Sequence, residues 1–296
     1  MKKNGLTIST VFEAESGNYG EGTGNIMSLK HMTRAGGKVY TYISRQALRY
    51  SMIQQLQWGN TPVKASGSGQ KTVVQFQPNA SIREYPEVDL FGYMKTGDKN
   101  SDNKNARTRS AVVRLSNAVS LEPYKADMDF LTNMGLARRL GKDAVNSIAQ
   151  SEIHHSFYAY TITIDLDCVG IDGNDNTKLP ANVRYGRIAD FLSCVEFLYR
   201  DIKARRENLA PVFVIGGLYQ RKSPFFENRI KLKNGNRLNT DILAETIQAI
   251  GEPTMVGCLN GEFSNEDEIK EKLAPVSIAE FFEKLKKQVK DDYASC

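Results

Sequence analysis

The segment from Phe157 to Val169 restricts the fold most, because its side chains alternate between two kinds. One face carries Tyr158, Tyr160, Ile162, Ile164, Leu166 and Cys168, and the other carries Ala159, Thr161, Thr163, Asp165 and Asp167. A period of two residues is typical of a strand, whose successive side chains point to opposite faces. The segment therefore predicts a half-buried strand of an antiparallel sheet.

Strand and helix patterns alternate along the rest of the chain. Strand-like runs lie at 6–12, 73–76, 111–119 and 211–219. Helix-like runs lie at 44–58, 185–203 and 240–250, and a last helix opens with the capping box Ser277-x-x-Glu280. The residues from 122 to 151 are mixed and partly helical. Two strand–helix–strand units predict an α+β fold with a ferredoxin-like or RRM-like core, and 296 residues suffice for a single domain, 1–296, with long insertions.

Composition and cysteine spacing exclude several classes of protein. The chain is 41% hydrophobic and 25% charged, which is ordinary for a folded soluble protein. No apolar run is long enough to span a membrane, and the first residues do not resemble a secretory signal. The four cysteines are widely spaced and indicate reduced thiols rather than disulfides or a zinc site. We therefore expect a cytoplasmic protein without a membrane partner.

The motifs of common enzymes are absent. The glycine-rich segment 17–24 matches neither a P-loop nor a dinucleotide fingerprint. His154 and His155 are adjacent, so in an extended segment they point apart and make poor metal co-ligands. Asp165 and Asp167 share a strand face, which is most often solvated. We expect no catalytic residue, no metal and no cofactor.

One helix start suits the binding of an anion. A turn at Gly36-Gly37-Lys38 precedes Ser44, which is a good helix cap that leaves backbone N–H groups free near the start. Arg45 and Arg49 are four residues apart and share a face, and Gln46 adds a donor and an acceptor. On this motif alone, an ordinary capped helix with exposed arginines is favoured over a nucleic-acid site.

Basic residues also gather between 95 and 125. Three acidic residues in this segment face seven basic ones, which are Lys95, Lys99, Lys104, Arg107, Arg109, Arg114 and Lys125. The net charge of the whole chain is only +5, so this segment carries most of it. A mobile basic loop fits phosphate contact through counterion release, and a solvated loop fits equally well.

Several segments, in order along most of the chain, resemble one family. The turn at 36–38 with Ile43–Arg49 resembles the "R-I-S-S-Q-S-L-K-R" helix start of the backbone subunits of the CRISPR Cascade complex. Residues 90–94 resemble their "L-F-G-R-M" segment, and 117–120 resemble "H-A-I-S". Residues 157–160 and 165–167 resemble "F-Y-R-Y…D-L-D". The opening at 12–16 resembles the DevR branch, which is found in type I-B systems.

The resemblance implies a fold and a function. It implies an RRM-like palm with helical fingers at about 17–85 and an inserted thumb at about 121–156. Many copies of such a subunit stack along one guide RNA (crRNA) and present it for pairing with target DNA in antiviral defence. Contacts go mainly to phosphate, ribose and stacking surfaces. The implied partners are further copies of the chain, the guide 5′-end cap subunit, the guide-processing subunit, and the large and small subunits.

The resemblance also implies site residues. Lys38, Ser44, Gln46 and Arg49 hold the guide backbone, and Arg45 stands where the pattern has a second serine. Met94 packs against a guide base. The loop from 95 to 109, with Arg107 and Arg109, touches nucleic acid or a neighbouring subunit. Leu136, Arg138 and Arg139 lie near the tip of the thumb.

Two alternatives stay open. Related type III backbone subunits cleave RNA with a loop aspartate, and Asp127, Asp129 and Asp143 are candidates for that role. The DevR name also suggests a stand-alone regulator that binds DNA.

Overall fold

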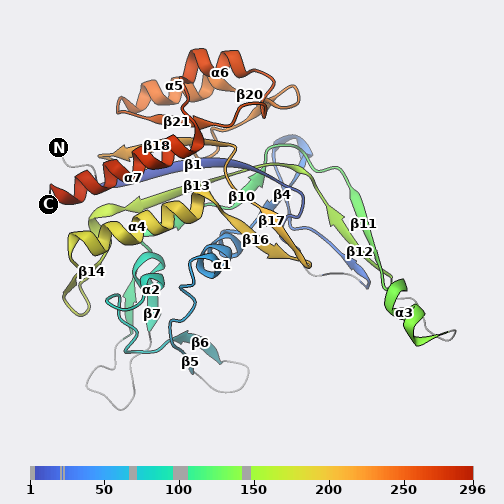
Figure 1. Ribbon diagram of the computed structural model, residues 1–296, viewed down its shortest axis with the longest axis horizontal. Helices are drawn as coiled ribbons and strands as arrows, with labels where there is room; N and C mark the ends of the chain where they lie inside the picture. The colour runs from blue at the N-terminus through green and yellow to red at the C-terminus, as the bar shows by residue number, and fades with distance from the viewer. Residues whose placement is uncertain are drawn as a thin grey trace.

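The computed structural model describes residues 4–20, 22, 24–66, 72–95, 106–141 and 148–295. Its centre is an eight-stranded sheet with the order β21-β18-β1-β13-β10-β4-β3, in which β9 also pairs with β13 (Figure 1). The strands are β1 (Gly5–Ala14), β3 (His31–Thr33), β4 (Val39–Ile43), β9 (Val113–Leu115), β10 (Ala118–Ser120), β13 (Ser156–Asp165), β18 (Phe213–Tyr219) and β21 (Met255–Cys258). The fold is mixed α/β.

The strand predicted from alternation is present as β13. It pairs antiparallel with β1 on one side and with β9 and β10 on the other. The face with Tyr158, Tyr160 and Ile162 is buried in the main core, as expected. The regular strand ends at Asp165, and a 3-10 turn at Leu166–Cys168 follows, so Asp167 does not continue the strand face.

Three helices cover this face of the sheet. They are α1 (Arg45–Gln55), α4 (Ala181–Glu196) and α7 (Ile278–Ala294), and α4 and α7 run side by side. The predicted capping box is present, because the Ser277 side chain accepts from the Glu280 N–H at 3.2 Å. The prediction for α4 was too long: it ends at Glu196, and Tyr199–Ile202 form β16, which pairs with β17 (Arg205–Asn208).

A second core lies on the opposite face of the sheet. It contains Phe157, Phe213 and Phe226 and is covered by α5 (Thr240–Ile250) and α6 (Glu266–Leu273). The short strands β19 (Leu232–Lys233) and β20 (Arg237–Leu238) belong to this layer, at the top of Figure 1. Gly251 ends α5 in the left-handed conformation, which glycine adopts without strain.

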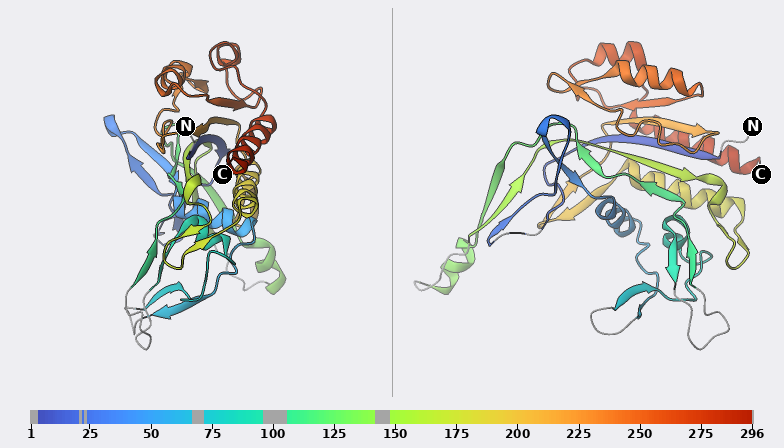
Figure 2. Two further views of the ribbon diagram at one scale, coloured as in Figure 1. Left: turned by 90° about the vertical axis from the view of Figure 1, so that its left-hand side faces the viewer. Right: turned by 180° about the vertical axis from the view of Figure 1, so that it is seen from behind.

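An arm projects from one end of the sheet. It consists of β11 (Asp127–Thr132), α3 (Met134–Leu140), β12 (Ile148–Ile153) and β2 (Ile26–Met27), with α3 at its far end (Figure 1, Figure 2). The sequence predicted a mixed, partly helical segment here. The structure shows a hairpin that carries one helix, and most of its side chains are exposed.

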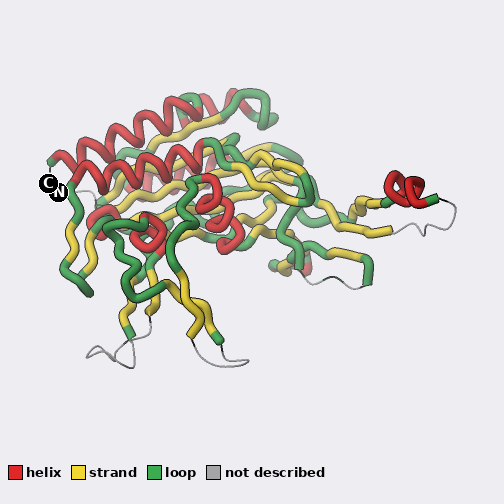
Figure 3. The backbone as a smooth tube through the Cα atoms, turned by 60° about the horizontal axis from the view of Figure 1, so that its bottom comes forward, coloured by secondary structure: helices red, strands yellow, loops and turns green. Residues whose placement is uncertain are grey.

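A second group of small elements extends below the sheet (Figure 3). It contains the hairpin of β5 (Val63–Ser66) and β6 (Val73–Phe76), the helix α2 (Pro86–Phe91), and the hairpin of β7 (Tyr93–Lys95) and β8 (Arg107–Arg109). The hairpin of β14 (Ile171–Asp172) and β15 (Thr177–Lys178) lies close by, because Tyr93 bonds to Asp172. Among the described residues, no helix is both long and apolar enough to cross a membrane.

Candidate nucleic-acid interface

The start of α1 is capped from two directions. The Ser44 side chain accepts from the Ala47 N–H at 3.3 Å, which confirms the predicted cap. The Arg45 N–H donates to Asn117 Oδ1 at 2.9 Å, an oxygen that comes from the link between β9 and β10. Of the first three helical N–H groups, only that of Gln46 has no partner within the described chain. The helix start therefore offers fewer free donors than the sequence suggested.

The exposed side of α1 borders a hollow, which we call the α1 hollow. Its rim carries Arg45, Gln46 and Arg49, and its floor is formed by Phe91, Val113 and Leu115. The Arg49 guanidinium lies 5.6 Å from the centre of the Phe91 ring, so a cation and an aromatic face are presented together. Three side chains that the sequence assigned to one site thus do lie together, above an apolar surface.

Lys38 lies apart from these residues. It follows Gly36 and Gly37, whose positive φ angles of 79° and 72° make the tight turn before β4. β4 separates Lys38 from Ser44 by five residues, which is roughly 17 Å of extended chain. Lys38 is exposed, and Arg34 faces it across the turn with its guanidinium 5.0 Å from the Tyr40 ring centre.

A second hollow lies on the other face of the sheet, which we call the β10 hollow. It is lined by Arg34, Asn117, Val119, Ala159, Phe226 and Lys231, among others. The two hollows meet at the link between β9 and β10, because Leu115 lines the first and Ser116 lines the second. The sequence pattern predicts one continuous strand over 111–119, whereas the structure has two strands with this link between them. The loop at 226–231 was also missed, since its basic residues are scattered among apolar ones.

Met94 and Arg107, two predicted contact residues of the β7–β8 hairpin, are both exposed. Met94 in β7 is 60% exposed, so its thioether is available for contact with a partner. Arg107 in β8 is also exposed. The predicted contact loop itself, with Lys99 and Lys104, falls at 96–105, outside the described residues.

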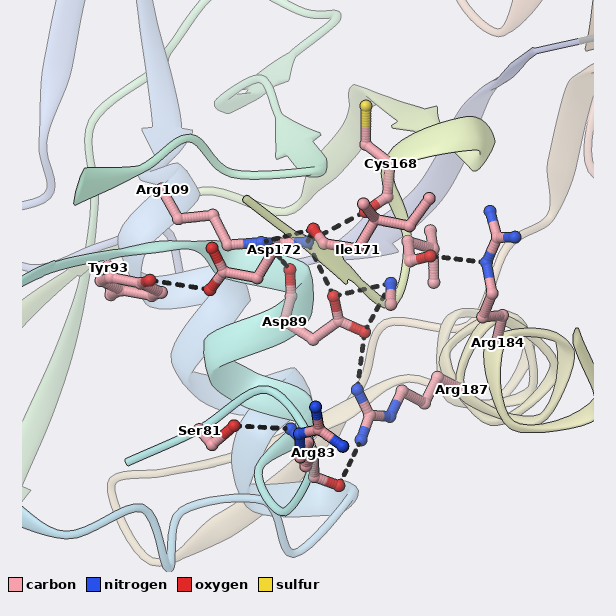
Figure 4. Close-up of polar contacts among 12 residues, drawn as sticks. Ser81, Arg83, Asp89, Tyr93, Arg109, Cys168, Ile171, Asp172, Arg184 and Arg187 are labelled. Carbon is pink, nitrogen blue, oxygen red and sulfur yellow. Dashed lines mark hydrogen bonds and ion pairs between the residues drawn. The ribbon is translucent and has the colours of Figure 1, made fainter. Parts of the chain in front are cut away.

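The structure corrects the prediction that Arg109 contacts nucleic acid. Its side chain is only 7% exposed and makes its contacts inside the protein. Figure 4 shows its guanidinium beside Asp89, to which it donates at 2.8 Å, and beside the carbonyl oxygens of Cys168 and Ile171. Asp89 also pairs with Arg187 at 2.7 Å. A buried carboxylate is stable only when its charge is compensated, so Arg109 serves the fold and is not free to bind phosphate.

The same cluster supports β7. The Tyr93 hydroxyl donates to Asp172 Oδ2 at 2.7 Å, and burial together with this hydrogen bond raises the pKa of Tyr93 to about 12. The phenol therefore keeps its proton and its role as donor. Tyr93 and Arg109 are paired with each other at the base of the β7–β8 hairpin, so these contacts fix that base next to Met94.

The arm carries the remaining predicted residues. Arg138 and Arg139 are exposed on α3 and have no ion pair with any other described residue. Phe130 and Met134, on the same arm, are 62% and 45% exposed. Leu136 lies in α3, but its side chain is outside the described part. The views show α3 far from α1, so one chain does not bring these two groups together (Figure 1, Figure 2).

Asp165, Asp167, His154 and His155 do not form a common site. Asp165 pairs with Arg114 at 2.9 Å and Asp167 with Lys222 at 2.5 Å, so neither belongs to a merely solvated face. His154 is buried and bonds to Thr41, whereas His155 is exposed. Within the described ranges, no group of three or more histidine, cysteine, aspartate or glutamate side chains is suited to a metal ion.

Comparisons with known proteins give a consistent result. A family model described as "CRISPR-associated negative auto-regulator DevR/Csa2" matches residues 6–235. A protein of Myxococcus xanthus (strain DK1622), named "CRISPR-associated protein Cas7/Cst2/DevR", is 25% identical over 183 residues. This match covers 58% of the chain and 60% of the relative, so the chain spans about 60% of that protein's length.

Two solved structures share the fold. A chain of a "CRISPR RNA-guided surveillance complex, pre-nicking" matches with a TM-score of 0.62 and 11% identity, over 96% of this chain and 100% of the other. A chain of a "CRISPR RNA-guided surveillance complex" matches with a TM-score of 0.53 and 15% identity, over 86% and 87%. At these identities, the likeness is one of fold.

Proposed function

Because this chain belongs to the CRISPR-associated DevR/Csa2 family, we propose that it is a non-catalytic backbone subunit of a type I Cascade complex. In this proposal, copies of the chain assemble along a guide RNA and present it for pairing with target DNA. Type I-B is proposed from the resemblance of residues 12–16 to the DevR branch. The likeness to chains of two CRISPR RNA-guided surveillance complexes supports an RNA-guided complex. The cap, guide-processing, large and small subunits of such a complex are its proposed partners.

The strand order supports an RRM-like palm. Taken along the chain, β1, the β9–β10 pair, β13 and β18 are the four strands of a βαββαβ unit, with α1 after the first and α4 after the third. Their order in the sheet is β18-β1-β13 and then the β9–β10 pair, which is the antiparallel arrangement of a split βαβ fold. In this proposal the arm is the thumb, expected at about 121–156. The fingers, expected at about 17–85, include the β5–β6 hairpin below the sheet, although β2 lies in the arm and β3 and β4 lie in the sheet.

One observation carries the proposal of RNA binding. Arg45 and Arg49 are exposed at the rim of the α1 hollow, and Lys38 is exposed in the turn that also carries Arg34 of the β10 hollow. None of these three cations has an ion pair with a described residue. Many other arginines of the chain are paired with acids, including Arg109, Arg187, Arg200, Arg205, Arg206 and Arg237. Unpaired cations beside an apolar surface suit the phosphates and bases of a single strand.

The test compares two double variants of equal charge. Lys38→Ala with Arg49→Ala removes two proposed phosphate contacts. Arg206→Ala with Lys284→Ala removes two exposed cations elsewhere. We expect the first pair to weaken guide RNA binding equally for all guide sequences, and to make the salt dependence shallower by roughly 1.4 in log–log slope. The control should bind like the wild type. A loss that depends on guide sequence, or an equal loss in both pairs, would contradict the proposal.

The non-catalytic part has its own test. Asp127 and Asp129 lie exposed on β11, and Asp143 is outside the described residues. We expect no cleavage when the assembled complex is incubated with complementary RNA and magnesium. Regularly spaced cuts that disappear in Asp129→Asn would replace this proposal with that of a guide-directed endonuclease.

A further inference from the structure

We propose that the β16–β17 hairpin holds the arm at a fixed angle to the central sheet, and that Lys203 at the tip of this hairpin is the positioning residue. The arm is the projection formed by β11, α3, β12 and β2. The hairpin acts in this way in the free chain. Its consequence for RNA rests on the proposed function, because that consequence takes the arm and α1 to contact the same bound strand.

The root of the hairpin is anchored where the chain leaves the central sheet. Glu207 is buried, and its Oε1 accepts from the backbone N–H groups of Glu15 and Ser16 at 3.1 and 3.0 Å. These two residues directly follow β1 and lead toward β2 in the arm. Arg200, on the paired strand, donates to Glu207 Oε2 at 2.7 Å and so compensates the buried charge. The root of the hairpin is therefore fixed to the end of β1.

The tip of the hairpin reaches the arm. The Lys203 ammonium donates to Ser151 Oγ on β12, and it lies 3.6 Å from the centre of the Tyr19 ring. Ser151 is only 1% exposed, in an arm whose side chains are mostly exposed. The Tyr19 hydroxyl donates in turn to the carbonyl oxygen of Glu152, the next residue on β12, at 3.1 Å. One lysine thus contacts both β12 and the segment that leads to β2.

Asp129 adds an electrostatic contact from the other strand of the arm. It lies opposite Ser151 in the register of β11 and β12. Burial lowers the pKa of Lys203, and the Asp129 carboxylate opposes this shift because it favours the charged ammonium. Lys203 therefore interacts with both strands of the arm hairpin.

The turn that carries Lys203 has a conformation that its residues disfavour. Ile202 pairs with Arg205, so the turn has only two residues. These are Lys203 and Ala204, whose φ angles are 47° and 62°. Two positive φ angles are typical of a type I′ turn, in which asparagine and glycine are preferred because a Cβ crowds the left-handed backbone. Such strain is concentrated at functional positions, and here the strained turn presents the side chain that contacts the arm.

The hairpin supports the arm from a second side. Two other contacts at the base of the arm come from the segments that lead into it. The Leu29 N–H donates to Glu152 Oε2 at 2.8 Å, and the His154 N–H donates to the Glu15 carbonyl oxygen at 2.8 Å. In contrast, β16 and β17 lie between α1 and the arm (Figure 1), and β16 packs beside α1. Loss of the Lys203 contact leaves the two base contacts in place, so it should change the angle of the arm without unfolding it.

The angle of the arm decides where its far end lies. Arg138 and Arg139 are exposed on α3 at that end. The helix α1, which carries Arg45 and Arg49, lies far from α3 in the same chain (Figure 1, Figure 2). In the proposed function both groups contact one RNA strand, and their separation then fixes how many nucleotides one copy occupies. We therefore expect Lys203 to affect the spacing of copies along the RNA more than the affinity of the chain for RNA.

The first measurement follows the arm in the free chain. Fluorophores are attached through p-acetylphenylalanine at two exposed positions, Thr132 on the arm and Gln248 on α5, and energy transfer is recorded from single molecules. We expect one narrow distribution without further change, and a broadened or shifted one in Lys203→Ala. Ser151→Ala should have the same effect, and the double variant no larger one, since both changes remove one contact. Arg206→Ala, in the same hairpin and with the same loss of charge, is the matched control.

The second measurement uses the complex assembled on guide RNA. Limited ribonuclease digestion releases protected fragments whose lengths differ by the number of nucleotides that each copy occupies. We expect a regular series of lengths for the wild type and for Arg206→Ala. Lys203→Ala should lose this regularity while its affinity for RNA stays close to that of the wild type. Ala204→Gly relieves the strain of the turn but keeps the lysine, so it should keep the regular series.

The outcomes separate the two proposals. If the wild-type chain does not bind guide RNA, the proposed function fails, and the energy-transfer measurement still tests the hairpin. If Lys203→Ala behaves like Arg206→Ala in both measurements, the inference is overturned. It is also overturned if Ser151→Ala leaves the energy-transfer distribution unchanged, because the contact with β12 is then not what holds the arm. A broadened distribution with an unchanged series of fragment lengths would overturn the effect on spacing.

Discussion

Replacing Asp89 by asparagine tests the cluster that fixes the β7–β8 hairpin. The Asp89 side chain is fully buried and pairs with Arg109 at 2.8 Å and Arg187 at 2.7 Å. It also accepts from the Gly170 N–H at 2.9 Å. Asparagine has nearly the same shape, so the change removes charge while leaving the space filled. Two buried guanidinium groups then lack their counter-ion.

The magnitude follows from that geometry. Removing one partner of a buried ion pair costs about 3–5 kcal/mol, because the remaining charge stays buried without compensation. For a chain of this size, that loss lowers the melting temperature by roughly 6–20 °C. Urea unfolding followed by circular dichroism measures it, and the slope against urea should stay unchanged while the midpoint falls.

The matched control is Asp201→Asn. Asp201 makes the same kind of two-point contact with Arg206, at 2.9 Å and 3.1 Å, but at the surface, where the two side chains are 67% and 64% exposed. Water and salt screen that pair, so its loss should leave the midpoint near that of the wild type. If both variants shift the midpoint equally, or if Asp89→Asn leaves it unchanged, the reasoning about the buried cluster is refuted.

Three other changes have definite expected results. Gly92→Ala should prevent stable folding, as measured by the yield of soluble protein, because φ is 71° and a Cβ would lie 2.3 Å from the Arg109 carbonyl oxygen. Burial raises the pKa of the Cys194 thiol to about 12, so iodoacetamide at about pH 8 should modify it only after unfolding, as read by mass spectrometry. Burial raises the pKa of Glu207, but Arg200 and two backbone N–H groups outweigh this and lower it below the ordinary 4.5. As the pH drops, this carboxyl is protonated in the unfolded chain before it is protonated in the folded chain, so the free energy of unfolding decreases below about pH 4.5. In Glu207→Gln, the free energy of unfolding measured by urea titration should decrease less over the same pH range.

The sequence predicted those elements whose signals come from residues close together in the chain. The alternation at 157–169 predicted β13, and the capping residues Ser44 and Ser277 marked the starts of α1 and α7 correctly. Each of these signals depends on residues within one turn or one strand. The family resemblance was found from short segments, and the family match confirms it.

Long-range pairing accounts for what was missed. The sequence placed Arg109 among free cations, because nothing local shows that Asp89 and the carbonyl oxygens near 168–171 receive it. The helix at 185–203 was extended too far, since Tyr199–Ile202 become a strand by pairing with β17. The strand at 111–119 is divided because Ser116 and Asn117 bond to other elements. The β10 hollow needs three distant segments and has no linear signature.

The position of β1 has a consequence for how the chain is made. β1 leaves the ribosome before its two neighbours, β13 and β18, and β18 ends only at Tyr219. At 5–20 residues per second, roughly 10–40 s pass before both edges of β1 are covered. Until β18 is made, at least one edge of β1 lacks its partner strand, and Leu6, Ile8 and Phe12 are not yet in their complete core. The central sheet is therefore completed late in synthesis, and nascent-chain chaperones have access to the apolar side chains of β1 until then.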